Sequence, residues 1–172
     1  PLSIRSEVGQ FLPDWRPEQD YRRSVSARKE LGGGVLLELS HDIDYLIWLF
    51  GRVHSVQGVL SKSNELEIDV DDLANIILQF FDDKSKEVIP ASLTMDFLRH
   101  DSTRTCTVIC SEGTIRWNAI KGSVEVYRSG GSGWESVITE NCGLDYTYVD
   151  ELHKFVECVE KGETKIFESV YD

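Results

Sequence analysis

The chain has 172 residues with 30 acidic and 18 basic side chains, which gives a formal net charge of −12. Hydrophobic residues make up 41% of it, the balance of a globular domain rather than a disordered segment. This charge argues against nucleic-acid binding, because a phosphate-binding surface needs clustered Lys and Arg. No segment reaches the ~18 consecutive apolar residues of a membrane-spanning helix, so no membrane association is expected. We expect one domain covering residues 1–172.

The first third of the chain predicts one strand and two helices. Residues 3–12 alternate weakly between apolar and polar side chains, which predicts a short strand. A mostly polar surface helix is predicted over 18–31, and the glycine triplet at 32–34 ends it. The strongest helical pattern covers 35–50, and Gly51 follows as a stop signal.

The predicted helix at 35–50 has two different faces. At about 100° per residue, seven apolar side chains fall on one side. They are Val35, Leu36, Leu39, Ile43, Leu46, Ile47 and Phe50. The opposite side carries Glu38, His41 and Asp44, with Tyr45 beside them. One face is therefore predicted to enter a core, and the other brings two carboxylates and an imidazole together.

After Gly51 the hydrophobic period changes to two, which predicts a run of strands. The segments are 53–60, 73–81, 87–98, 103–110, 114–117, 124–127 and 134–138. Helical spacing returns over 148–159. Short connections favour antiparallel pairing, and segregated helices and strands indicate an α+β fold. We expect an open, mainly antiparallel β-sheet of about six strands, with helices packed on one face.

The sequence predicts neither a disulfide nor a metal site. Cys106 and Cys110 lie in one predicted strand, too far apart to share a bridge or an ion. Reduced cysteines favour a cytoplasmic location. Asp69, Asp71 and Asp72 lack the later glycine and glutamate of a calcium loop, so we expect a solvated entry to the next strand.

His41 with its neighbouring carboxylates is the first candidate for chemistry. An imidazole moves a proton near neutral pH, and a carboxylate fixes its orientation or charge. Glu38 and Asp44 lie three residues before and after His41, within side-chain reach on one helix. The alternative is a solvated helix face without function.

A loop framed by two prolines is the second candidate. It contains Asp14-Trp15-Arg16, held outside a helix interior. A Trp–Arg pair can stack on and hydrogen-bond a sugar-like or anionic ligand. In the alternative, Trp15 packs against the next helix while Arg16 extends into solvent. Tyr45, beside His41, completes the substrate-binding candidates.

Residues 32–51, GGGVLLELSHDIDYLIWLFG, resemble the signature of the glucose–fructose oxidoreductase / inositol dehydrogenase (Gfo/Idh/MocA) family. That signature is a glycine-rich turn, an apolar run, an acid, H-x-x-D, a leucine-rich helix and a glycine. Later segments are similar as well: EIDVDDLANIILQF at 67–80, CSEGTIRW at 110–117 and YVDELHKFVECVEKGE at 148–163. The resemblance thus extends through most of the chain.

The resemblance implies a domain organisation and a cofactor. Family members have an N-terminal Rossmann domain that binds NAD or NADP, followed by an α+β domain with an open sheet. This chain resembles the second domain alone, since it has no G-x-G-x-x-G and no E-K-P stretch. It therefore looks cut at both ends. We expect NAD or NADP in the full-length parent, no cofactor bound to this fragment, and no activity of the fragment alone.

The resemblance also assigns roles by position. His41 matches the family's catalytic histidine, which acts in proton transfer at a substrate hydroxyl or carbonyl. Asp44 matches an aspartate that lines the substrate pocket. The family's catalytic aspartate falls at Leu37 here, so Glu38 is the catalytic candidate in its place. Trp15 and Arg16 match the substrate loop.

The function implied is that of a substrate and oligomerisation domain of an NAD(P)-dependent oxidoreductase acting on a sugar or polyol. Two alternatives of another class are a non-catalytic oligomerisation module and a free sugar-binding module. A homo-oligomer is expected through an apolar open sheet face, with the strands at 73–81 and 93–98 as candidates.

Overall fold

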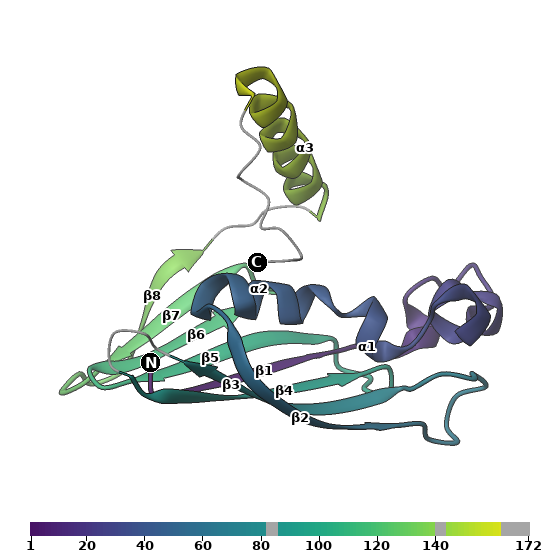
Figure 1. Cartoon of the computed structure of the whole chain (residues 1–172), viewed down its shortest axis with the longest axis horizontal. Helices are drawn as coiled ribbons and strands as arrows, with labels where there is room; N and C mark the ends of the chain where they lie inside the picture. Colours follow the sequence, from purple (N-terminus) through teal and green to yellow (C-terminus); the bar gives the residue numbers. More distant parts are fainter. Residues whose placement is uncertain (82–85, 140–143, 163–172) are drawn as a thin grey trace. The chain divides into compact units, whose positions relative to one another are not determined.

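The computed structural model describes residues 1–81, 86–139 and 144–162 (Figure 1). The chain divides into two compact units, Pro1–Thr139 and Glu140–Asp172. The described part of the second unit contains one helix, α3 (Leu144–Lys161), whose apolar residues Val149, Leu152 and Phe155 are exposed. The single-domain organisation stays a prediction.

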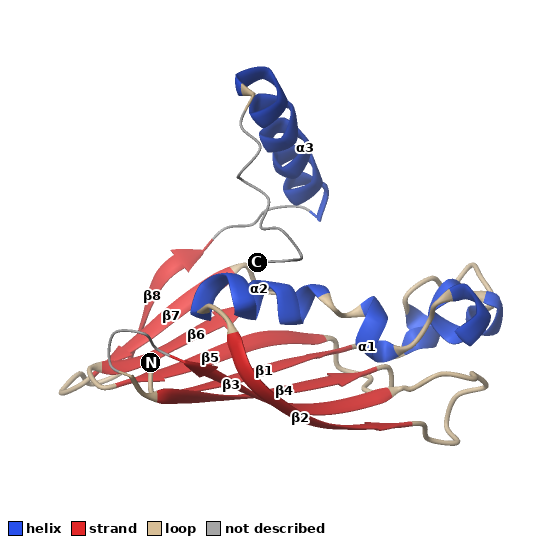
Figure 2. Ribbon diagram, viewed as in Figure 1, coloured by secondary structure: helices blue, strands red, loops and turns tan. Residues whose placement is uncertain are grey.

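The first unit is built on an eight-stranded sheet in the order β2-β3-β4-β1-β5-β6-β7-β8 (Figure 2). The strands are β1 Ser3–Gly9, β2 Val53–Ser61, β3 Leu73–Phe81, β4 Val88–Asp96, β5 Thr103–Cys110, β6 Gly113–Asn118, β7 Ser123–Arg128 and β8 Trp134–Thr139. Only the pair β1–β4 is parallel among these strands. The predicted α+β class and the open, mainly antiparallel sheet are confirmed, with eight strands in place of about six.

The N-terminal strand lies in the middle of this sheet. Ile4 of β1 is paired with Ala91 of β4 on one side and with Val108 of β5 on the other. Its alternate residues Ile4, Ser6 and Val8 are buried against the helices. This insertion depends on pairing with strands more than 80 residues away, so local periodicity predicted the strand but not its place.

The predicted helix over 18–31 is wrong. The chain instead forms short 3-10 turns: η1 Leu12–Asp14, η2 Tyr21–Arg23, η3 Val25–Ala27 and η4 Lys29–Leu31. The carbonyl of Ser26 accepts from the Gly34 amide, and that of Ala27 accepts from the Asp69 amide. Because other segments use these carbonyls, they do not form the bonds that would continue a helix.

The predicted helix over 35–50 is interrupted. It forms α1 (Val35–Glu38) and α2 (His41–Phe50), separated by Leu39 and Ser40 (Figure 1). Leu39 has φ −101° and ψ 17°, and the Asp42 amide bonds to the Leu39 carbonyl three residues back. The prediction of one continuous helix is therefore corrected at residues 39–40.

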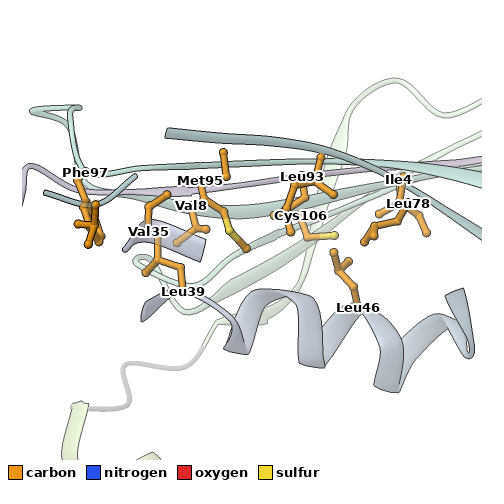
Figure 3. Close-up of a cluster of buried hydrophobic side chains, with 14 of the residues drawn as sticks. Ile4, Val8, Val35, Leu39, Leu46, Leu78, Leu93, Met95, Phe97 and Cys106 are labelled. Carbon is orange, nitrogen blue, oxygen red and sulfur yellow. The ribbon is translucent and has the colours of Figure 1, made fainter. Parts of the chain in front are cut away.

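The two helices cover one face of the sheet, as expected, and form the core with it (Figure 3). Their fully buried apolar residues include Val35 and Leu46, which pack with strand residues such as Leu93. Burial of each such side chain contributes roughly 1.5–3 kcal/mol. Ile43 and Ile47, predicted to be core residues, are only half-buried. The buried stripe is rotated, and Asp42 occupies a position within it.

The acidic segment before β3 is not the solvated strand entry that the sequence predicted. Asp72 is buried and accepts hydrogen bonds from the amide and the hydroxyl of Ser63, at 2.9 and 2.6 Å. Asp71 accepts from the Leu36 amide at the start of α1, at 3.1 Å. These carboxylates therefore bond to neighbouring backbone amides. In the described part of the chain no cluster of three or more His, Cys, Asp or Glu side chains could hold a metal ion.

Candidate functional site

Asp42 is the central residue of the candidate site, and its carboxylate is completely buried. Its Oδ2 lies 2.9 Å from His41 Nε2 and 3.2 Å from Arg104 Nε. Its Oδ1 accepts a hydrogen bond from the same Arg104 nitrogen at 3.4 Å. A buried carboxylate is costly unless charges compensate it, so Asp42 depends on both neighbours.

Arg104 reaches Asp42 from β5, where it is paired with Val8 of β1. Its side chain is one-third exposed. Its guanidinium carbon lies 5.6 Å from the centre of the Trp117 ring, within the range of a cation–π interaction. Arg104 is thus held between an aromatic face and the buried carboxylate.

Tyr45 lies one turn after Asp42 and points onto the sheet. Its hydroxyl shares a 2.6 Å hydrogen bond with Ser6, and its ring meets Trp117 edge-on at 5.2 Å. Burial raises the pKa of the Tyr45 hydroxyl, and burial also raises the pKa of the nearby Cys106 thiol. Both groups therefore stay protonated at neutral pH. The role of Tyr45 in substrate binding stays a prediction, since its hydroxyl is bonded within the chain.

The register of the sheet explains why these side chains meet. Ser6 of β1 is paired with Cys106 of β5, which is paired with Trp117 of β6. Residues paired in this way point to the same face of a sheet. The row therefore places a hydroxyl, a thiol and an indole side by side beneath α2.

His41 and Asp44 line the same shallow hollow on the surface of α2. His41 is half-exposed, and Ser40, Ile43 and Ile47 complete the lining. One ring nitrogen of His41 thus faces the buried Asp42, while the rest of the ring borders solvent. An imidazole in this setting can exchange a proton with a molecule bound in the hollow.

Glu38 lines a different hollow, a cavity of about 60 Å³ that it shares with Trp15 and Arg16. Ser24 lines this cavity as well, and two polar atoms of its lining residues stand out: Trp15 Nε1 and Ser24 Oγ. Both atoms are buried and have no hydrogen-bond partner in the described part of the chain. The turn at residues 39–40 separates this hollow from that of His41. The catalytic role of Glu38 stays a prediction.

Sequence reasoning missed Asp42, Arg104 and Ser24. A signal for Asp42 was present, since it lies three residues after Leu39 and four before Leu46, both core residues. An acid within an apolar stripe indicates a buried charge that needs a partner. Arg104 is 62 positions further along the chain and carries no comparable local signal.

The comparisons with known proteins agree with this fold. The model of the GFO/IDH/MocA C-terminal domain matches residues 1–116, more than half of the chain. No curated protein sequence matches significantly. Solved structures do match, and the chain spans about half of the length of several of them.

Three of these structures illustrate the likeness. Levoglucosan dehydrogenase in complex with NADH and levoglucosan is 22% identical, with a TM-score of 0.73, over 94% of this chain and 50% of that one. UDP-N-acetylglucosamine 3-dehydrogenase from Acidithiobacillus ferrooxidans is 13% identical, with a TM-score of 0.68, over 94% of this chain and 46% of that one. An inositol dehydrogenase homologue from Azotobacter vinelandii, complexed with NAD+, is 10% identical, with a TM-score of 0.64, over 83% of this chain and 37% of that one. With the match to the family model, the fold and the sequence lead to one conclusion: the chain belongs to the GFO/IDH/MocA C-terminal domain family.

Proposed function

We propose that this chain is the substrate domain of an NAD(P)-dependent oxidoreductase that acts on a hydroxyl or carbonyl group of a sugar or polyol. The observation that carries the proposal is the half-exposed His41 imidazole, backed by the buried Asp42 and next to Asp44 in one hollow. Support comes from the family membership and from relatives named as dehydrogenases of levoglucosan, inositol and a nucleotide sugar.

His41 is assigned the proton in this reaction. Oxidation of an alcohol removes a proton from oxygen and a hydride from carbon, and the nicotinamide cofactor of the parent protein supplies the hydride acceptor. A neutral imidazole can accept the hydroxyl proton, and the carboxylate of Asp42 stabilises the imidazolium that results. Asp44 would hydrogen-bond a substrate hydroxyl beside it.

The helix ends of the first unit do not fit a dinucleotide. A pyrophosphate is bound by free amides at a helix N-terminus that carries no negative charge. At α1 the Leu36 amide is already bonded to the Asp71 carboxylate, and the first turn of α2 carries Asp42 and Asp44. We therefore assign the dinucleotide to a part of the parent protein outside this unit.

The experiment is an assay of the parent protein, in which this domain is joined to a dinucleotide-binding domain. NAD and NADP are offered with a panel of sugars and polyols, and formation of the reduced nicotinamide is followed by absorbance. Turnover of at least one panel member supports the proposal. A parent that binds dinucleotide but oxidises none of them contradicts it, and sugar binding by the isolated chain in calorimetry would then favour a free binding module.

Trp15→Phe is expected to raise the KM of the parent enzyme for its substrate about tenfold, with kcat little changed. The change removes the buried Nε1–H, which has no partner in the described structure and is free for a substrate oxygen, and it also replaces the indole by a smaller phenyl ring. Steady-state kinetics measure the effect. Trp134→Phe, on the exposed β8 hairpin, is the matched control. An unchanged KM in Trp15→Phe would remove this cavity from the substrate site.

Oligomerisation through the sheet face opposite α1 and α2 is the second candidate function. Ile77 of β3 is 46% exposed there, above a hollow that it shares with Val59. The sequence predicted an exposed apolar face over 93–98, and this prediction is wrong. Leu93 points into the core, whereas its neighbour Thr94 faces outward. The proposed interface is thus a largely polar sheet face with apolar points.

Sedimentation of the chain over increasing concentration is expected to show association through this face. Ile77→Asp should weaken the association at least about tenfold, because it places a charge in a buried contact. Leu49→Asp, a similarly exposed residue on α2, is the control. A monomer at all concentrations would contradict the proposal.

The state of the cysteines supports the cytoplasmic location that we propose. Cys106, Cys110 and Cys158 are free thiols in the described structure. Free thiols suit a reducing compartment, which supports the cytoplasm. In the described part of the chain, none of the helices combines the length and apolarity that a bilayer crossing needs.

A further inference from the structure

We propose that the cavity lined by Trp15, Ser24 and Glu38, called the Trp15 cavity below, binds a second hydroxyl group of the substrate, one that is not oxidised. The inference rests on the proposed function and deepens it, because it names the group that sets substrate specificity. Its structural basis is a pair of buried polar atoms in the lining, Trp15 Nε1 and Ser24 Oγ. Neither has a hydrogen-bond partner among the residues that the structure describes.

Both of these donors are held in place by their surroundings. The Trp15 amide bonds to the Leu12 carbonyl at 3.2 Å, and its indole meets the Phe97 ring edge-on, with 5.3 Å between the ring centres. Ser24 is the residue before η3, a position where a serine hydroxyl commonly bonds to a backbone amide, yet its hydroxyl makes no such bond. A buried donor without a partner costs free energy, so a bound oxygen that accepts from both donors removes this cost.

The donors and acceptors of the lining suit a hydroxyl group. An indole N–H only donates, a carboxylate such as that of Glu38 only accepts, and a serine hydroxyl does both. A hydroxyl oxygen can accept from Trp15 and Ser24 while its proton bonds to Glu38. An ammonium group has no lone pair for the indole, and an ionised carboxylate has no proton for Glu38. Arg16 and Glu38 are the two charged lining residues, and their opposite charges leave no net charge to select an ion.

The size and the place of the Trp15 cavity suit one end of a sugar or polyol. One water molecule needs roughly 10–15 Å³ of such space, so a cavity of about 60 Å³ has room for a hydroxymethyl group. Glu38 of this cavity and His41 of the other hollow are three positions apart, which limits their α-carbons to a separation of at most about 11 Å. One substrate molecule can therefore present one hydroxyl to His41 and another to the Trp15 cavity.

Water is the competing occupant of this cavity. A water molecule also donates and accepts hydrogen bonds, and the cavity has room for it. The two explanations differ in whether polyols reach Trp15 Nε1 at all. They also differ in whether the lining residues change the preference for a substrate over an analogue that lacks one hydroxyl.

The first test is NMR on the 172-residue chain with isotope-labelled tryptophan. The indole N–H signal of Trp15, assigned with Trp15→Phe, is followed while glycerol, xylitol or glucose is added. The indole signals of the exposed Trp48 and of Trp134 report general solvent effects. At least one polyol is expected to shift the Trp15 signal until it saturates, and sodium acetate at the same concentration should not. A Trp15 signal that none of the three compounds moves would leave water as the sole occupant and overturn the inference.

Two variants test the lining itself. Ser24→Ala is expected to weaken polyol binding about tenfold, because it removes one of the two donors. Ser136→Ala, which changes an exposed serine of β8, is the matched control and should bind as the wild-type chain does. Unchanged amide signals of Leu46 and Leu93 certify the fold of each variant. Equal affinity in Ser24→Ala and the wild type would place the polyol elsewhere and overturn the inference.

The second test is the specificity of the parent enzyme. A substrate that it oxidises is compared with analogues that each lack one hydroxyl group. One analogue, altered away from the reacting carbon, is expected to lose about 100-fold in kcat/KM, and Ser24→Ala should reduce this loss to about tenfold. The same loss in the wild type and in Ser24→Ala would overturn the inference.

The two tests separate this inference from the proposed function. A parent without dehydrogenase activity, in a chain whose Trp15 signal polyols still shift, would overturn the proposed function and leave the hydroxyl site supported. An active parent in which polyols leave the Trp15 signal unmoved would overturn the hydroxyl site alone.

Discussion

Arg104→Met is expected to lower the free energy of unfolding of the chain by about 3 kcal/mol. The substitution keeps most of the side-chain volume and removes the guanidinium, so the completely buried Asp42 carboxylate would lose its neighbouring Arg104 charge. A buried charge that loses its partner is strongly destabilising, whereas replacing a whole buried pair by apolar residues is often neutral. Urea denaturation followed by circular dichroism measures the difference.

Two further variants make this result specific. Arg116→Met is the matched control, because Arg116 also lies over a tryptophan, at 4.0 Å from the Trp134 ring, and pairs with Glu125, but at the surface. Its loss should cost less than about 1 kcal/mol. The double variant Arg104→Met, Asp42→Leu should recover most of the stability that Arg104→Met alone loses. Equal losses for Arg104→Met and Arg116→Met would contradict the buried charge pair.

His41→Ala is expected to lower kcat of the parent enzyme by about 10²–10⁴-fold, the usual contribution of a positioned general base. The free energy of unfolding should fall less than in Arg104→Met, because Arg104 would still compensate the buried Asp42 carboxylate. Steady-state kinetics at saturating substrate measure the loss, and the KM should stay close to that of the wild type.

His54→Ala is the control for this experiment. His54 lies on the edge strand β2, with its ring 6.3 Å from that of Phe81, and it lines neither the hollow of His41 nor the cavity of Glu38. The kcat of the parent enzyme with His54→Ala should equal that of the wild type. If His41→Ala retained full turnover, His41 could not be the catalytic base.

Sequence periodicity predicted the strands well and the two helices over 18–31 and 35–50 less well. The strands at 73–81 and 103–110 have the predicted bounds, because one of their faces packs on a core and the period of two is visible. The helix at 18–31 was wrong because the carbonyls of Ser26 and Ala27 bond to residues 34 and 69, and other carbonyls of the segment bond three residues ahead in 3-10 turns. Contacts of this kind leave no local pattern.

The candidate site shows the same division. The spacing of His41 and Asp44 placed them on one face of a helix, and both line one hollow. Glu38 lies before the turn at 39–40 and lines the cavity of Trp15. Helical spacing predicts neighbours only while the helix is continuous.

The sequence alone determined the fold class and the resemblance to the Gfo/Idh/MocA family, because both depend on local periodicity and on the short motif at residues 32–51. It also singled out His41 as the candidate proton acceptor. Only the tertiary structure decided that β1 lies between β4 and β5, and that Asp42 is buried between His41 and Arg104. The strand pairings and the Asp42–Arg104 contact join residues far apart in the chain, and their free energy comes from burial and from charge compensation, which exist only once the sheet and α2 have packed together.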